Sequence, residues 1–173
     1  CDAIGKENVF GLILPEKESN SQSEMLAERL CNQLGISHRV IDISRILQNY
    51  GVYTDREKIV SKNFPDFNES CKYRLIFNEN FDNDGLNIPY LEVLDQSNKV
   101  HKIKISLDDY RIITGATNIK HRIRMTQLYY HAESQNYLVC GTTNKAEFQQ
   151  GYFVKYGDGG VDIEPLANLF KMQ

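Results

Sequence analysis

A glycine-rich stretch in the last third of the chain holds the residues best suited to chemistry. It runs from Gly141 to Asp162 and combines glycines, lysines and carboxylates directly after a predicted strand. Glycines let backbone N–H groups approach an anion, a lysine neutralises phosphate charge, and a carboxylate holds magnesium through its oxygens. The composition therefore indicates a polyphosphate site, although the spacing matches neither the Walker A loop nor G-x-G-x-x-G.

Several of these residues also fit ordinary structural roles. Glu147 lies three residues after Asn144, the spacing of a capping box, so its carboxylate could return a hydrogen bond to the helix cap instead of binding a metal. The glycines within 157–160 could form only a hairpin turn between two short strands. Lys155 and Asp162 could pair with each other on the surface.

The first third of the chain has the pattern of a strand, a helix and a second strand. The apolar run Val9–Leu14 is too short for a helix and predicts a buried strand. Ser21 and Glu24 have capping-box spacing at the start of a helix that Gly35 ends. His38–Ile43 predicts the next strand, and the helical crossover requires the two strands to be parallel. A ligand would then lie at the carboxyl edge of the sheet.

The middle third predicts antiparallel strands. Short strand-like runs are separated by Asn, Asp, Gly and Ser, and they are Cys71–Phe77, Ile88–Leu94 and Lys99–Ile105. The last two form a predicted hairpin across Asp95–Asn98. We interpret about 50–110 as a β-rich insertion.

Helical periodicity returns in the last third. Residues 118–135 form a predicted helix with apolar side chains on one side, namely Met125, Leu128, Tyr129 and Ala132. Tyr137–Cys140 predicts a short strand, and Asn144 can begin another helix.

Composition excludes several classes of protein. The 173 residues carry 20 Lys and Arg against 23 Asp and Glu, a net charge of −3, which gives no global field for nucleic acid. The longest apolar run is far below the ~20 residues that span a bilayer. Cysteines at positions 1, 31, 71 and 140 show no CxxC pair and suit reduced thiols. We expect one cytoplasmic domain over residues 1–173, with no membrane or nucleic-acid partner.

The glycine-rich stretch carries a resemblance to a known family. The segment 141–171, GTTNKAEFQQGYFVKYGDGGVDIEPLANLFK, resembles the signature stretch of the NAD synthetase family. Residues 118–125, NIKHRIRM, resemble the arginine-bearing helix of that family, and residues 5–15, GKENVFGLILP, resemble its second strand. The resemblance covers residues 1 to about 47 and about 112 to 173.

The resemblance implies a fold and a reaction. The fold is α/β, a Rossmann-like doubly wound parallel sheet of the adenine nucleotide alpha hydrolase type, here with the β-rich insertion. The implied enzyme belongs to the adenylate-forming ATP pyrophosphatases and converts deamido-NAD to NAD with ATP, Mg²⁺ and ammonia. A homodimer is the usual assembly of the family, and a glutaminase domain or partner could supply the ammonia.

The resemblance also implies roles for six residues by matching position. ATP would contact Thr142 and Lys171, magnesium would bind Glu147, and deamido-NAD would bind Arg122, Lys155 and Asp162. These types suit a reaction between two anions, because cations and a metal lower their repulsion and stabilise the leaving pyrophosphate.

Two features depart from the family pattern. The phosphate-binding loop Ser-Gly-Gly-x-Asp-Ser is absent, so we expect it upstream of Cys1, and we interpret the chain as a central fragment, incomplete at both ends, that is a poor catalyst alone. The insertion leaves the acceptor substrate open. The alternatives are a related adenylating ligase acting on another carboxylic acid and a catalytically silent nucleotide-binding or dimerisation module.

Overall fold

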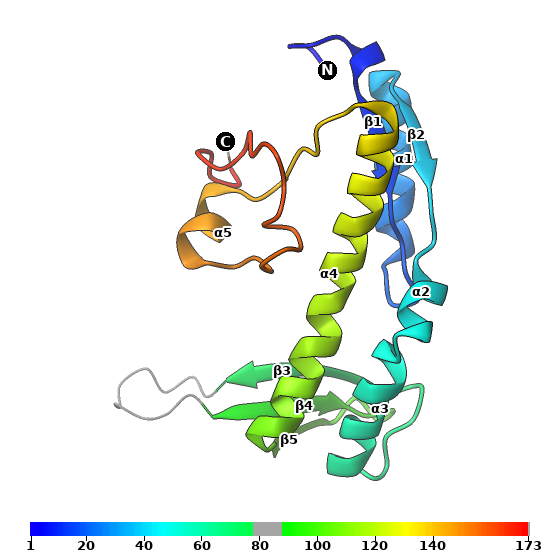
Figure 1. Cartoon of the computed structure of the whole chain (residues 1–173). Coiled ribbons are helices and arrows are strands. Elements are labelled where there is room, and N and C mark those ends of the chain that lie inside the picture. The colour runs from blue at the N-terminus through cyan, green and yellow to red at the C-terminus, as the bar shows by residue number, and fades with distance from the viewer. Residues whose placement is uncertain (78–87, 173) are drawn as a thin grey trace. The chain divides into compact units, whose positions relative to one another are not determined.

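The computed structural model describes residues 1–77 and 88–172 (Figure 1). The chain divides into two compact units. The first combines Cys1–Tyr50 with Ile119–Gln173, and the second is Gly51–Asn118. Each unit is described by itself below. Part of the expected insertion, residues 78–87, lies outside the described residues, and the single domain with its insertion stays a prediction.

The first unit begins with the predicted strand, helix and strand. After the 3₁₀ turn η1 (Lys6–Asn8), strand β1 (Phe10–Ile13) and strand β2 (Ser37–Val40) pair in parallel, with helix α1 (Ser21–Leu34) between them in sequence. The parallel pair is therefore confirmed. A short helix, α2 (Ser44–Asn49), follows β2.

Helix α1 begins at a different cap from the predicted one, but it ends at Gly35 as predicted. Asn20 is the N-cap, and its side-chain oxygen accepts a hydrogen bond from the Gln22 N–H at 2.9 Å. Asn is among the best N-cap residues, and its position one residue earlier makes Ser21 the first helical residue, so the predicted Ser21–Glu24 box is wrong. Gly35 ends the helix at a φ of 65°, a conformation that glycine adopts without a steric cost.

Helix α4 (Leu107–Gln135) is longer than predicted. It begins near Ser106, whose hydroxyl accepts a hydrogen bond from the Asp109 N–H at 3.1 Å, a capping contact that lengthens the helix at its start. Its last turns confirm the predicted apolar side: buried Met125 and Ala132 pack with Val139, against which Leu128, Tyr129 and Val161 also lie.

The second unit is a three-stranded antiparallel sheet with one helix of its own. Strand order is β3 (Lys72–Phe77), β4 (Pro89–Leu94) and β5 (Val100–Lys104), which confirms the predicted strands and hairpin. Helix α3 (Val52–Asn63) was not predicted. The core of the unit consists of buried side chains from the sheet and its helices, namely Val60, Cys71, Leu91, Val93, Ile105 and Ile113.

A buried carboxylate ties α3 to the start of α4 inside the second unit. The Asp109 side chain is 6% exposed and accepts hydrogen bonds from Lys62 Nζ at 2.9 and 3.0 Å and from Asn63 Nδ2 at 3.3 Å. The hydrogen bond from Lys62 holds the pKa of Asp109 below its usual range, against the opposing effect of burial. Because the folded-state pKa is depressed, this stabilisation is present at neutral pH and is lost as the pH falls through that pKa.

We expect Lys62→Met, in a full-length protein that carries this chain, to lower the free energy of unfolding by about 1–2 kcal/mol at pH 7. The difference from wild type should shrink below about pH 4, where Asp109 becomes protonated in the variant and in the unfolded chain. Urea unfolding at pH 7 and below about pH 4 measures the free energy of unfolding of each variant. Lys58→Met is the matched control on α3, since Lys58 forms an exposed surface pair with Asp55 at 3.5 Å. An equal loss in both variants would contradict the account.

Candidate functional site

Glu147 lies in the capping box that begins helix α5 (Lys145–Gln150). The Asn144 side chain accepts hydrogen bonds from the N–H groups of Ala146 and Glu147 at 3.0 and 3.2 Å, and Glu147 Oε2 accepts from the Asn144 N–H at 3.0 Å. The capping role is therefore confirmed. Oε1 has no hydrogen bond to the described residues, so the same carboxylate keeps one oxygen for a ligand.

The residues assigned to ATP lie on the two segments next to the start of α5. Thr142 is exposed two residues before Asn144. Exposed Lys171 follows a segment that the Lys145 N–H joins by a hydrogen bond to the Leu169 carbonyl at 2.9 Å. Thr142, Glu147 and the approach to Lys171 are thus brought together around one helix end.

Gly141 lies close to the end of the Glu164 side chain. A Cβ built on Gly141 would lie 2.5 Å from the Glu164 carboxyl carbon, so a side chain here would displace that carboxylate. The Gly141 N–H also donates to the Ile163 carbonyl at 2.8 Å, next to the isolated parallel bridge between Cys140 and Ile163.

The predicted strand Tyr137–Cys140 is wrong: this bridge is the only β-pairing of the segment within the described residues. The reason is a competing acceptor. The Val139 N–H donates to Asp162 Oδ2 at 2.7 Å, so a side chain takes the backbone donor that a strand ladder would use. No strand flanks the glycines at 157–160 either, so the hairpin alternative is also wrong.

Arg122 and Lys155 are brought together by a backbone contact. Arg122, on α4, donates through Nε to the Lys155 carbonyl oxygen at 3.2 Å. The exposed Lys155 side chain places Nζ 4.9 Å from the ring centre of Tyr156. The contact therefore joins two segments 33 residues apart, and each of them carries a cationic side chain that an anionic ligand could use.

Asp162 does not pair with Lys155. One carboxylate oxygen accepts the Tyr129 hydroxyl at 2.9 Å, and the other accepts the Val139 N–H, so the surface-pair alternative is wrong. Burial, and then the Asp162 carboxylate, raise the pKa of Tyr129, which keeps the phenol protonated as the donor. Tyr129 was assigned only to packing, because nothing in its spacing from Asp162 signals the contact.

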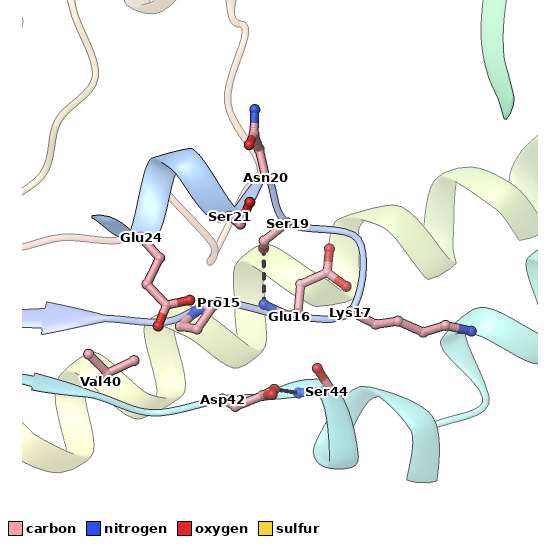
Figure 2. A pocket seen from close by; sticks show the side chains of 10 residues that line it. All are labelled: Pro15, Glu16, Lys17, Ser19, Asn20, Ser21, Glu24, Val40, Asp42 and Ser44. Atoms are coloured by element: carbon pink, nitrogen blue, oxygen red, sulfur yellow. Dashed lines mark hydrogen bonds between the residues drawn. The ribbon is translucent and has the colours of Figure 1, made fainter. Parts of the chain in front are cut away.

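A cavity of about 230 Å³ lies at the carboxyl end of the β1–β2 pair. Figure 2 shows its lining, in which the Glu16 N–H donates to the Ser19 hydroxyl at 3.0 Å and the Ser44 N–H donates to Asp42 Oδ1 at 2.6 Å. Hydrogen bonds from Ser44 lower the pKa of Asp42. None of the six assigned residues lines the cavity, but its position matches the edge where open α/β sheets bind ligands.

Helix α4 also holds the segment that leads into this cavity. Lys120 is 7% exposed, and its Nζ lies 3.1 Å from Glu16 Oε1 and 2.5 Å from Glu18 Oε2. Arg124 Nε donates to the Leu14 carbonyl at 3.2 Å, just beyond β1. The same helix therefore carries Arg122 and anchors the end of the parallel strand.

Comparisons with known proteins identify the family of the chain. The family model described as NAD synthase matches residues 1–88 and 83–173. An NH(3)-dependent NAD(+) synthetase of Mesorhizobium japonicum is 38% identical over 171 residues, which cover 99% of this chain and 54% of that protein. The chain spans about half the length of the curated relatives it matches.

Solved structures of synthetases are also similar to this chain over about half of their length. An NH3-dependent NAD synthetase from Campylobacter jejuni aligns with a TM-score of 0.59 and 26% identity, over 99% of this chain and 51% of that one. An NMN synthetase from Francisella tularensis aligns with a TM-score of 0.57 and 25% identity, over 94% and 46%. The expected α/β fold of the adenine nucleotide alpha hydrolase type is confirmed. The chain therefore belongs to the NAD synthase family.

Proposed function

We propose that the protein carrying this chain is an amide-forming ligase that converts deamido-NAD to NAD with ATP and ammonia, releasing AMP and pyrophosphate. The observation that carries the proposal is the contact between Arg122 and the Lys155 carbonyl, in a chain of the NAD synthase family. Relatives named NH(3)-dependent NAD(+) synthetase support ammonia as the nitrogen donor.

The reaction needs two transfers at the nicotinate carboxylate. A carboxylate oxygen attacks the α-phosphorus of ATP, and the bond from that phosphorus to the bridging oxygen breaks, so pyrophosphate leaves. Ammonia then attacks the acyl carbon of the mixed anhydride, the bond to AMP breaks, and nitrogen loses a proton to form the amide. No side-chain nucleophile is required, so positioning and charge supply most of the effect.

Arg122 and Lys155 would bind the acceptor substrate. Arg122 and Lys155 lower the repulsion between the anionic deamido-NAD and ATP, while Thr142 and Lys171 contact ATP. Asp162 already accepts two hydrogen bonds, and a carboxylate offers about four lone-pair positions. Its contact with deamido-NAD would therefore use positions that Tyr129 and Val139 leave open.

Glu147 suits magnesium only together with substrate phosphates. Within residues 1–77 and 88–172, no group of three His, Cys, Asp or Glu side chains could hold a metal alone. Mg²⁺ typically takes one or two carboxylates and completes its shell with phosphates and water, which Glu147 Oε1 would satisfy. Bound there, the ion would offset the charge that develops on the leaving pyrophosphate.

Assembly and location stay predictions. We propose a homodimer in the cytoplasm, with free ammonia or a glutaminase domain as the nitrogen source. Among the helices that the structure describes, none is long and apolar enough to cross a bilayer.

A second candidate function keeps the chemistry and changes the acid. The alignment with an NMN synthetase favours a test of other carboxylic acids, in which pyrophosphate release is compared over a panel of acceptors.

The main test incubates the full-length protein with deamido-NAD, ATP, Mg²⁺ and ammonia. Equimolar NAD and AMP are expected. Formation of neither, with any acid of the panel, would favour the catalytically silent module.

We expect Glu147→Gln to reduce turnover by at least about tenfold at low Mg²⁺ and to change the thermal midpoint by under about 2 °C. The amide oxygen of Gln can still accept the Asn144 N–H, so the cap survives while the charge is lost. Asn144→Ala is the control that removes the cap, at about 1 kcal/mol of stability. Mg²⁺-dependent turnover that stays at the wild-type rate while the midpoint drops would leave Glu147 with the capping role alone.

We expect Lys155→Ala to raise the apparent KM for deamido-NAD about tenfold, equivalent to ~1.4 kcal/mol, and to leave the KM for ATP within about twofold. The loss follows from removing a cation that attracts the anionic substrate. Lys104→Ala, which removes an exposed lysine from β5, is the control. An unaltered dependence on deamido-NAD would argue against the assignment.

A further inference from the structure

The main chain around Lys155 is held by a compact turn. Asp158 Oδ1 accepts the Val154 N–H at 2.9 Å, and the Val154 carbonyl accepts the N–H groups of Gly157 and Gly159 at 2.8 and 3.3 Å. Tyr156 has a φ of 61°, which is uncommon for a bulky residue and persists only where neighbouring contacts impose it. The turn, residues 154–160, therefore depends on the Asp158 side chain.

One histidine of α4 contacts this turn at two points. His121 Nδ1 lies 3.3 Å from Asp158 Oδ1. A Cβ built on Gly157 would lie only 2.8 Å from the His121 Cβ, so the imidazole-bearing residue packs directly against the turn. The next residue, Arg122, holds the Lys155 carbonyl. Two adjacent helix residues therefore hold the main chain on both sides of the Lys155 side chain.

We propose that His121 is a positioning residue: through Asp158 it holds the turn of residues 154–160, and so places the Lys155 side chain to bind the anionic acceptor substrate. The substrate part of this inference rests on the proposed function, whereas the contact itself does not.

The charges around His121 decide what kind of contact this is. Asp158 faces it from the turn, and Arg124 and Lys120 lie near it on α4. Burial, together with the positive charges of Arg124 and Lys120, lowers the pKa of His121 despite the attraction of Asp158. The lowered pKa favours the uncharged imidazole, and Nδ1 is the ring nitrogen that faces the Asp158 carboxylate at 3.3 Å. An asparagine amide is also uncharged and carries N–H groups that can face a carboxylate.

The test compares three variants of the full-length protein: His121→Ala, His121→Asn and the control His131→Ala. His131 lies on the same helix, and its ring contacts Tyr130. In His121→Ala we expect amide hydrogen exchange within residues 154–160 to accelerate about tenfold. The KM for deamido-NAD should rise about three- to tenfold, with the KM for ATP within about twofold. His121→Asn and His131→Ala should behave like wild type in both measurements.

The outcomes separate the two proposals. Unchanged exchange at 154–160 in His121→Ala would overturn the contact, and faster exchange with an unchanged KM for deamido-NAD would overturn its role at the substrate. A parallel rise of both KM values, or no rescue by His121→Asn, would show general destabilisation and also overturn the positioning role. A wild-type protein that makes no NAD refutes the proposed function, while the exchange data still decide the contact.

Discussion

The site depends on one constraint, the attachment of α4 to two segments that lie far from it in sequence. Side chains three or four residues apart share a face of a helix. Lys120 and Arg124 are four apart and hold the segment that follows β1. Arg122 and Tyr129, seven apart, hold the glycine-rich segment at Lys155 and Asp162. Helical periodicity thus lets one element bind the end of a parallel strand on one side and the proposed substrate segment on another.

The proposed chemistry follows from how charge is distributed around these contacts. Arg122 contacts the main chain at Lys155, so two cationic residues lie on segments in contact, while the start of α5 supplies the Glu147 oxygen that the cap does not use. An anionic acceptor and a magnesium-bound polyphosphate need such complementary environments close together. Glu147 and Asp162 each have a structural hydrogen bond as well as an assigned ligand role. Capping and ligand binding are therefore compatible uses of the same carboxylate.

Local signals predicted much of the fold. The parallel strands, the antiparallel hairpin and the Asn144–Glu147 box follow from runs, turns and spacing within a few residues. The early start of α4 also had a local signal, because Ser106 and Asp109 are spaced as a helix cap. The prediction from apolar periodicity did not use it. The contacts of Tyr129 with Asp162 and of His121 with Asp158 join residues 33 and 37 positions apart. No local spacing encodes these contacts. The hydrogen bond from the Val139 N–H to Asp162 is long-range in the same way, which is why the sequence predicted a strand at 137–140.

The most direct test of this account is a crystal structure of the full-length protein with Mg²⁺, a non-hydrolysable ATP analogue and deamido-NAD. The account predicts deamido-NAD on Arg122 and Lys155, the ATP analogue at Thr142, and the ion between Glu147 Oε1 and the phosphates. The Tyr129–Asp162 bond should persist. A structure in which both ligands bind elsewhere, and Arg122 and Lys155 face solvent, would contradict the account.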